Sequence, residues 1–234
     1  MVDPNSKIET RNPLIVFAKP PAPGRVKTRL TTALSDEEAA RLYAAFLGDT
    51  VDGYADLAAD VRLYWSRAPD DGDASLPAGN ALSEHVQQGD GLGARMRRAF
   101  RETLDAGAER AVIVGTDHPT LPAAFVERAF AALDEPERIC IGPSDDGGYY
   151  LLGMNAFYPQ LFADMTYSRG DVFEETLERT RRTSADLTVL PSWYDVDTPA
   201  DLRRLAHDLD ADPSIRAPRT RRTVKALRKQ IAST

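Results

Sequence analysis

The chain has 234 residues, of which 42% are hydrophobic and 28% are charged, and its formal net charge is −7 at pH 7. This composition is typical of a globular protein with a core of its own, and no apolar run is long enough to predict a membrane-spanning helix. Residues 1–13 lack the apolar core of a signal peptide and the single cysteine, Cys140, allows no internal disulfide, so we expect a cytoplasmic protein.

The first predicted element is a buried strand, Leu14 to Ala18, and a loop rich in cations follows it at once. Residues 19–30 contain three prolines, one glycine and no acid, and their four cations are Lys19, Arg25, Lys27 and Arg29. Prolines stiffen the loop, so its cations need little ordering to converge on an anion. Ligands also bind at the carboxyl ends of strands in open α/β sheets. A solvated surface is the alternative, but the rest of the chain is acidic, so the pattern favours a phosphate-binding loop.

This loop does not match a P-loop, although Lys27 is followed by threonine as in that motif. The P-loop motif requires glycine at the positions that Val26 and Pro21 hold here. Backbone wrapping around a phosphate is therefore disfavoured, and the sequence argues against a P-loop NTPase.

Helices and strands alternate along the rest of the chain. A helix is predicted over residues 36–57, behind a capping box formed by Ser35 and Glu38, with Gly53 as a candidate point of interruption. Strands are predicted at 61–65, 110–115, 138–142, 149–154 and 187–190, and helices at 91–105, 121–133, 170–182 and 199–209, with a loop at 68–80. This alternation predicts an α/β fold, a three-layer α/β/α arrangement with a mostly parallel central sheet. Residues 142–170 break the alternation, so we expect an inserted hairpin or antiparallel strand there.

Two acidic motifs follow predicted strands. Asp117 comes directly after the strand at 110–115, and Asp195 and Asp197 follow the strand at 187–190. Alternating residues of an extended segment point to opposite sides, so only one of the latter two is expected to face Asp117. Carboxylates suit Mg²⁺ or Mn²⁺, which use one or two protein acids plus substrate phosphates. Helix capping is the alternative role for these acids.

Two glycine-containing segments suit close approach of a ligand to the backbone. Asp146, Gly147 and Gly148 could bind sugar hydroxyls or supply a base, or they could turn a hairpin. Gln87 opens a second segment, in which Gly89, Gly91 and Gly93 precede the helix at 91–105. The spacing of these glycines does not fit the dinucleotide-binding fingerprint.

The C-terminal residues differ sharply in charge from the rest of the chain. Residues 213–234 contain seven cations and no acid, so residues 1–212, with 22 cations against 36 acids, carry a formal charge of −14. We expect residues 1–212 to form a single domain and residues 213–234 a basic tail, folded as a short helix docked on that acidic body. Binding to nucleic acid or to an anionic membrane is the alternative for the tail. The acidic body argues against general nucleic-acid binding, which needs a broad basic surface.

Taken together, these motifs resemble the glycosyltransferase-A-like, or nucleotide-diphospho-sugar transferase, superfamily. The blocks that carry the resemblance are residues 19–30, 87–96, 115–119, 142–153 and 193–202. Within the superfamily the chain is similar to bacterial and archaeal glycosyltransferases that resemble the cofactor-F420 guanylyltransferase, some of them named arsenosugar-biosynthesis glycosyltransferases. Sugar-nucleotide pyrophosphorylases usually carry Gly-x-Gly-x-Arg after the first strand, whereas Pro21 and Pro23 stand in that loop here.

The resemblance implies roles for individual residues. It implies that Asp117 and Asp197 (or Asp195) hold Mg²⁺ or Mn²⁺. Phosphates would be contacted by Lys19, Lys27 and Arg29, and the base would lie near the loop with Gln87, Gly89 and Gly91. The sugar or acceptor side would be lined by Asp146, Gly147 and Gly148. Lys27 would neutralise charge on the leaving group, and Asp146 would activate an acceptor hydroxyl.

The leading hypothesis is a metal-dependent transferase that moves a sugar from a sugar nucleotide to an unidentified small acceptor and releases an NDP. The alternative is a nucleotidyltransferase that joins an NTP to a small phosphorylated acceptor and releases pyrophosphate. The same cations and acids serve both reactions. A nucleotide-binding regulatory protein is a third hypothesis, which the full set of acids and cations disfavours.

Overall fold

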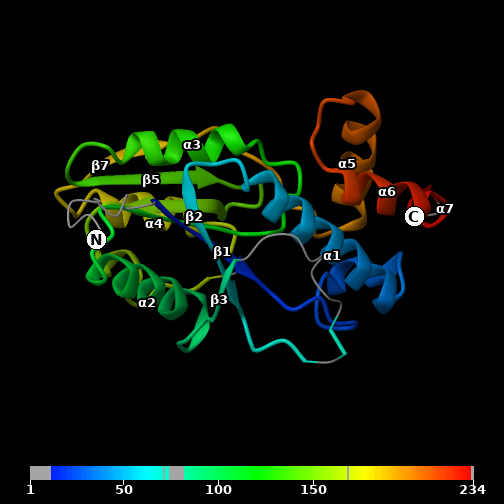
Figure 1. The fold of residues 1–234 in the computed structure, drawn as a ribbon, viewed down its shortest axis with the longest axis horizontal. Helices are drawn as coiled ribbons and strands as arrows, with labels where there is room; N and C mark the ends of the chain where they lie inside the picture. Colours follow the sequence, from blue (N-terminus) through cyan, green and yellow to red (C-terminus); the bar gives the residue numbers. More distant parts are fainter. Residues whose placement is uncertain (1–11, 71, 74–81, 168, 233–234) are drawn as a thin grey trace, which may run out of the picture.

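A computed structural model describes residues 12–70, 72–73, 82–167 and 169–232. In these residues seven strands form one sheet in the order β3-β2-β1-β4-β6-β5-β7 (Figure 1). The strands are β1 (Asn12–Ala18), β2 (Ala59–Trp65), β3 (Ser83–Val86), β4 (Ala111–Val114), β5 (Arg138–Pro143), β6 (Tyr149–Met154) and β7 (Asp186–Val189). β6 runs antiparallel to both of its neighbours, and the other pairs are parallel. The predicted α/β fold and the antiparallel strand within residues 142–170 are confirmed.

Helices cover both faces of the sheet, because successive apolar side chains along the strands point to opposite faces and both faces must be buried. They are α1 (Asp36–Gly53), α2 (Gly91–Asp105), α3 (Ala123–Ala132), α4 (Val172–Thr180), α5 (Pro199–Ala211), α6 (Pro218–Ala226) and α7 (Arg228–Ala232), with short 3₁₀ helices η1 (Thr28–Thr32) and η2 (Pro159–Leu161). Leu14 and Val16 pack against α1 and α3, whereas Ile15 between them packs against α2 on the other face. The arrangement is therefore a three-layer α/β/α fold.

Local signals set the ends of several helices. Ser35 and Glu38 form the predicted capping box of α1, and Thr198 and Asp201 form a second one that begins α5. α1 ends at Gly53 rather than near residue 57, and α3 begins at Ala123, with Pro122 as its N-cap, rather than at residue 121. Most of the predicted loop at 68–80 lies outside the described residues.

A third apolar cluster lies beside the sheet and joins the C-terminal residues to the rest of the molecule. α1 turns one side toward the sheet and contributes Leu42 and Phe46 from another side to this cluster, where Leu205 of α5, Val224 of α6 and Ile231 of α7 also lie. Figure 1 shows α6 and α7 beside α1 and α5, at the end of the molecule opposite the sheet. The division into a domain of residues 1–212 and a tail stays a prediction. Among the described residues, no helix combines the length and apolarity needed to cross a membrane.

Candidate active site

The structure brings together three of the predicted site residues, although they are far apart in the sequence. The ammonium Nζ of Lys27 donates to Oδ1 of Asp197 at 2.9 Å and also to Oδ1 of Asp117. Lys27 is buried, with 2% of its side chain exposed, whereas the carboxylates of Asp117 and Asp197 are 45% and 39% exposed. An ammonium thus lies between two acids whose outer sides face solvent.

The backbone around Lys27 turns this cation inward. Lys27 has a left-handed conformation, with φ of 49°, and it precedes η1. Its neighbours Val26 and Leu30 are buried in the cluster formed by α1 and α5. The Nζ atom lies 5.6 Å from the ring centroid of Phe46 and 5.9 Å from that of Tyr43. The aromatic side of α1 therefore lies beside the cation without neutralising it, and the two carboxylates supply the opposite charge.

The pKa values of the ion pair reflect a balance between burial and charge. Burial by itself lowers the pKa of Lys27, but the charges of Asp117 and Asp197 outweigh burial and raise it. Burial likewise acts to raise the pKa of Asp117, and the Lys27 ammonium reverses this, so the net pKa of Asp117 is lowered. Lys27 and Asp117 are therefore held in their charged forms at neutral pH.

Tyr43 of α1 ties the loops after β1 and β4 to each other. Its Oη accepts a hydrogen bond from the backbone N–H of Lys19 at 3.0 Å and lies 2.7 Å from Oγ1 of Thr116, which precedes Asp117. Burial, and then the charge of Asp117, raises the pKa of Tyr43 to about 12. Tyr43 was not predicted as a site residue, because a tyrosine on the apolar side of a helix carries no distinguishing signal.

Asp195 and Asp197 have different partners, as their alternation predicts. Asp195 accepts a hydrogen bond from Oγ of Ser144 at 2.6 Å and lies 3.3 Å from Nδ1 of His118, while Asp197 lies at Lys27. The backbone N–H of Val196 between them donates to the carbonyl of Asp117 at 2.8 Å. His118 and Ser144 were not predicted, although His118 directly follows Asp117 in the sequence.

The other loop cations are exposed and available to a ligand. Lys19, Arg25 and Arg29 form no ion pair with any acid in the part of the chain that the structure describes. They lie on the loop that supplies Lys27, after the carboxyl end of β1. The structure thus leaves three exposed cations on this loop without an ion-pair partner among the described residues; the charge of Lys19 acts on Asp117, and that of Arg25 on Asp73.

The side chain of Gln87 links the end of β2 to α2. The side chain of Gln87 donates to the carbonyl of Tyr64 at 2.8 Å and accepts from Arg95 at 3.3 Å, and Arg95 also donates to the carbonyl of Gly89. Gly89 and Gly91 both have positive φ. The predicted role of Gln87 in binding a base stays a prediction, and the structure shows its side-chain amide engaged within the chain.

The segment before β6 has a constrained backbone. Gly147 has φ of 85°, and a Cβ atom on it would lie 2.0 Å from the carbonyl oxygen of Gly170, so no other residue fits there. The N–H of Gly148 donates to Oδ1 of Asp146 at 2.9 Å. Burial, and then the charges of Asp195 and Asp197, raises the pKa of Asp146. Asp146 is therefore linked electrostatically to the acids near Lys27.

The acid pair fits a divalent cation only in combination with a substrate. Among the described residues no group of three or more His, Cys, Asp or Glu side chains is arranged to hold a metal ion. Mg²⁺ commonly takes one or two carboxylates and completes its shell with water and substrate phosphates. Asp117 and Asp197, each with a partly exposed carboxylate, supply such a set.

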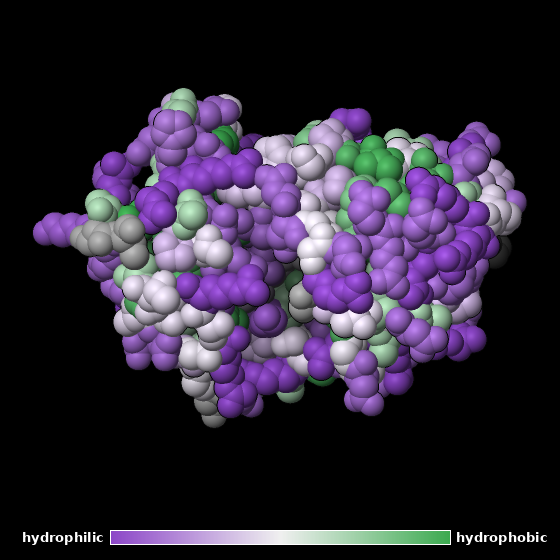
Figure 2. Space-filling model, turned by 180° about the vertical axis from the view of Figure 1, so that it is seen from behind, coloured by the Kyte–Doolittle hydropathy of each residue, from purple (hydrophilic) through white to green (hydrophobic). Residues whose placement is uncertain are grey.

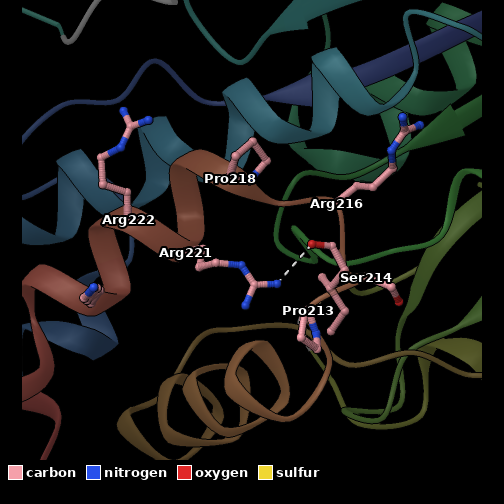
Figure 3. Close-up of a pocket in the computed structure, with 8 residues that line it drawn as sticks. Pro213, Ser214, Arg216, Pro218, Arg221 and Arg222 are labelled. Atoms are coloured by element: carbon pink, nitrogen blue, oxygen red, sulfur yellow. Dashed lines mark hydrogen bonds between the residues drawn. The ribbon is translucent and has the colours of Figure 1, made fainter.

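A cavity in the C-terminal residues lacks cations that converge on a common ligand position. Seen from behind, the molecule is mostly hydrophilic and is hollowed near its middle (Figure 2). A separate cavity of about 570 Å³ lies in the C-terminal residues (Figure 3). There Arg221 donates to the carbonyls of Leu209, Asp212 and Ile215, and Arg216 and Arg222 extend to opposite sides of the view. These cations do not converge, so we place no ligand in this cavity.

Comparison with known proteins identifies the family. Residues 50–169 match the family model described as "Uncharacterized protein conserved in bacteria (DUF2064)". The chain belongs to this family. It is 31% identical over 208 residues to a 3-phospho-D-glycerate guanylyltransferase of Phenylobacterium zucineum (strain HLK1), an alignment that covers 86% of this chain and 89% of that relative.

Solved structures agree with the fold of this DUF2064 protein. A crystal structure from Desulfovibrio desulfuricans G20, assigned provisionally as a nucleotide-diphospho-sugar transferase, is 33% identical with a TM-score of 0.86 and covers 95% of this chain and 97% of its own. The inositol-1-phosphate CTP transferase from T. maritima, 13% identical with a TM-score of 0.51 over 86% of this chain and 96% of its own, shares the fold. The protein is a transferase of the nucleotidyltransferase and nucleotide-sugar transferase type.

Proposed function

We propose that this protein transfers a nucleotidyl group from an NTP to a small phosphorylated acceptor and releases pyrophosphate. The observation that carries the proposal is the group of exposed cations, Lys19, Arg25 and Arg29, on the loop that also supplies Lys27 to the pair Asp117 and Asp197. A nucleoside triphosphate and a phosphorylated acceptor bring more negative charge than a nucleotide sugar and a neutral hydroxyl. Several unneutralised cations on one loop suit the more highly charged pair of substrates.

In this reaction an oxygen of the acceptor phosphate attacks the α-phosphorus of the NTP. A new P–O bond forms there, and the bond between the α-phosphorus and the bridging oxygen breaks, so that its electrons leave with pyrophosphate. The chain's cations would hold the triphosphate in line and offset charge on the leaving group. Asp117 and Asp197 would hold Mg²⁺ or Mn²⁺, which supplies Lewis-acid polarisation of phosphate oxygens when bound.

The guanylyltransferase relative guides the choice of substrates. We infer that GTP is the first nucleotide to test and 3-phospho-D-glycerate the first acceptor, because the relative's name contains both guanylyl and that phosphorylated acid. The predicted links to the cofactor-F420 and arsenosugar enzymes, and the cytoplasmic location, stay predictions.

The experiment is a product assay with purified protein and Mg²⁺ or Mn²⁺. The protein is incubated with each NTP and a panel of phosphorylated acids, and pyrophosphate and the nucleotidyl product are measured by a coupled assay and by mass spectrometry. We expect equal amounts of the two products, and an Asp117→Asn variant should lose about 100-fold or more of kcat. Release of an NDP from nucleotide sugars, with no pyrophosphate from any NTP, would contradict the proposal.

Transfer of a sugar from a sugar nucleotide is the second candidate, favoured by the provisional assignment of the Desulfovibrio structure. Asp146 separates the two reactions. A hydroxyl acceptor needs a base, whereas a phosphate oxygen is already deprotonated at neutral pH. An Asp146→Asn variant, which can still accept the hydrogen bond from Gly148, should therefore retain nucleotidyl transfer within about threefold but lose sugar transfer by about 100-fold.

A further inference from the structure

The Lys27 ammonium occupies the space between the two acids that are proposed to hold the metal. It donates to the Oδ1 atom of both Asp117 and Asp197, and it is itself almost completely buried. An ammonium has three donors, and these two bonds use two of them. Within the described residues the Oδ2 atoms of both acids have no hydrogen-bond partner, and the lysine bonds to Oδ1 of each acid.

Lys27 and a divalent cation compete for the same negative charge. With Lys27 in place, the two carboxylates and the ammonium together carry one negative charge, whereas without it they carry two. A divalent ion that enters between the acids must displace the ammonium, or it binds more weakly because the positive charge of Lys27 reduces its attraction to the carboxylates. The buried ammonium, for its part, cannot lose both acids unless another anion receives it.

We propose that Lys27 is an internal counter-ion of the acid pair, which a divalent cation displaces only when substrate phosphates accept the lysine. The proposal rests on the metal site of the proposed function. The flexible four-carbon stem of Lys27 lets Nζ move from one anion to another, and Lys19 and Arg29 on the same loop mark where phosphates are expected. Metal and nucleotide then bind with positive coupling, and each raises the affinity of the protein for the other.

The test is Mn²⁺ binding without nucleotide, measured by electron paramagnetic resonance of free Mn²⁺ and by calorimetry. Lys27→Met should bind Mn²⁺ about tenfold or more tightly than the wild type, because it removes the competing charge. Lys19→Met is the matched control, since Lys19 lies on the same loop but does not bond to the acids, and it should change Mn²⁺ affinity by no more than about threefold. Adding Asp117→Asn to Lys27→Met should abolish the gain.

A second measurement tests the coupling. A non-hydrolysable NTP analogue should raise the Mn²⁺ affinity of the wild type by a larger factor than that of Lys27→Met. Thermal unfolding with and without Mn²⁺ checks that each variant folds, and Lys27→Gln serves as the second neutral variant should Lys27→Met not fold.

Mn²⁺ binding in Lys27→Met that is equal to or weaker than in the wild type, or no binding at all, would overturn the counter-ion proposal. Equal coupling in the two proteins would overturn it as well. Failure of the product assay is a separate outcome, because Mn²⁺ binding in these variants requires neither the acceptor nor turnover.

Discussion

Asp195 and Asp197 are separated by one residue but take part in different interactions. Asp197 contacts the Lys27 ammonium, whereas Asp195 accepts a hydrogen bond from Ser144 and lies at Nδ1 of His118. The N–H of Val196 donates to the carbonyl of Asp117, so the segment is fixed to the end of β4 at two neighbouring points. We therefore expect Asp195 to act as a positioning residue, which sets the separation of the acids on either side of Lys27.

This assignment predicts different effects on Mn²⁺ binding for two chemically equivalent substitutions. Asp197→Asn should weaken Mn²⁺ binding in the presence of nucleotide by about tenfold or more, since it removes a charged ligand. Asp195→Asn should change Mn²⁺ affinity by less than about threefold and lower kcat by about tenfold, because misplacement of the acids affects geometry more than charge. Calorimetry and steady-state kinetics measure the two effects, and a larger loss of Mn²⁺ affinity in Asp195→Asn would reverse the roles.

α6 depends on a carboxylate that another helix supplies. Asp49 of α1 is fully buried, and its two oxygens accept hydrogen bonds from the backbone N–H groups of Arg219 and Thr220 at 3.1 and 2.7 Å. The first N–H groups of a helix have no partner within the helix, and no side chain of α6 caps them. Asp49 thus replaces the missing cap and joins the C-terminal residues to α1.

We expect Asp49→Ala to lower the free energy of unfolding by about 2 kcal/mol, because two buried N–H groups lose their acceptor. Asp52→Ala is the matched control: Asp52 pairs with the side chain of Arg219, but it is half exposed, and an exposed pair contributes about 0.5 kcal/mol. Urea unfolding of both variants gives the comparison. Equal losses would show that the charge of the pair, rather than the cap, attaches α6.

Elements with buried side chains can be predicted from the sequence more closely than elements whose side chains are all exposed. α2 begins and ends at the predicted residues because its buried side chains, among them Met96 and Phe100, recur at helical spacing. β3 was not predicted: all of its residues are exposed at the edge of the sheet, so neither alternation nor an apolar run distinguishes it.

The same reasoning applies to the site. Acids and cations that directly follow predicted strands are expected together at the carboxyl ends of the strands, and the structure brings Lys27, Asp117 and Asp197 together. The burial of Lys27 could not be predicted, because lysine is almost always exposed and its position depends on packing between η1, α1 and α5. The contacts of Tyr43 and His118 also arise only when distant segments meet.

The free energy of unfolding depends on pH through the net charge of the whole molecule and through the ion pair of Lys27. The body of the chain is strongly acidic, so protonation of surface acids toward the isoelectric point near 5.1 relieves repulsion. The pKa of Asp117 is lowered in the folded protein, so its contribution to stability is present above its ordinary value of 3.8 and is lost as pH falls below it. The pKa of Lys27 is raised, so its contribution is lost only as pH rises above 10.5.

The difference in unfolding free energy between the wild type and Lys27→Met should therefore be largest between pH 3.8 and pH 10.5. It should shrink as pH falls below 3.8. Without the ammonium, burial raises the pKa of Asp117, so the variant gains stability relative to the wild type as that carboxyl is protonated. Urea unfolding at pH 7, 4 and 3 measures the difference. Arg29→Met is the control, because Arg29 has no ion pair among the described residues and its effect should not depend on pH in this range. A difference for Lys27→Met that stays constant from pH 7 to 3 would mean that the pair with Asp117 does not stabilise the folded molecule.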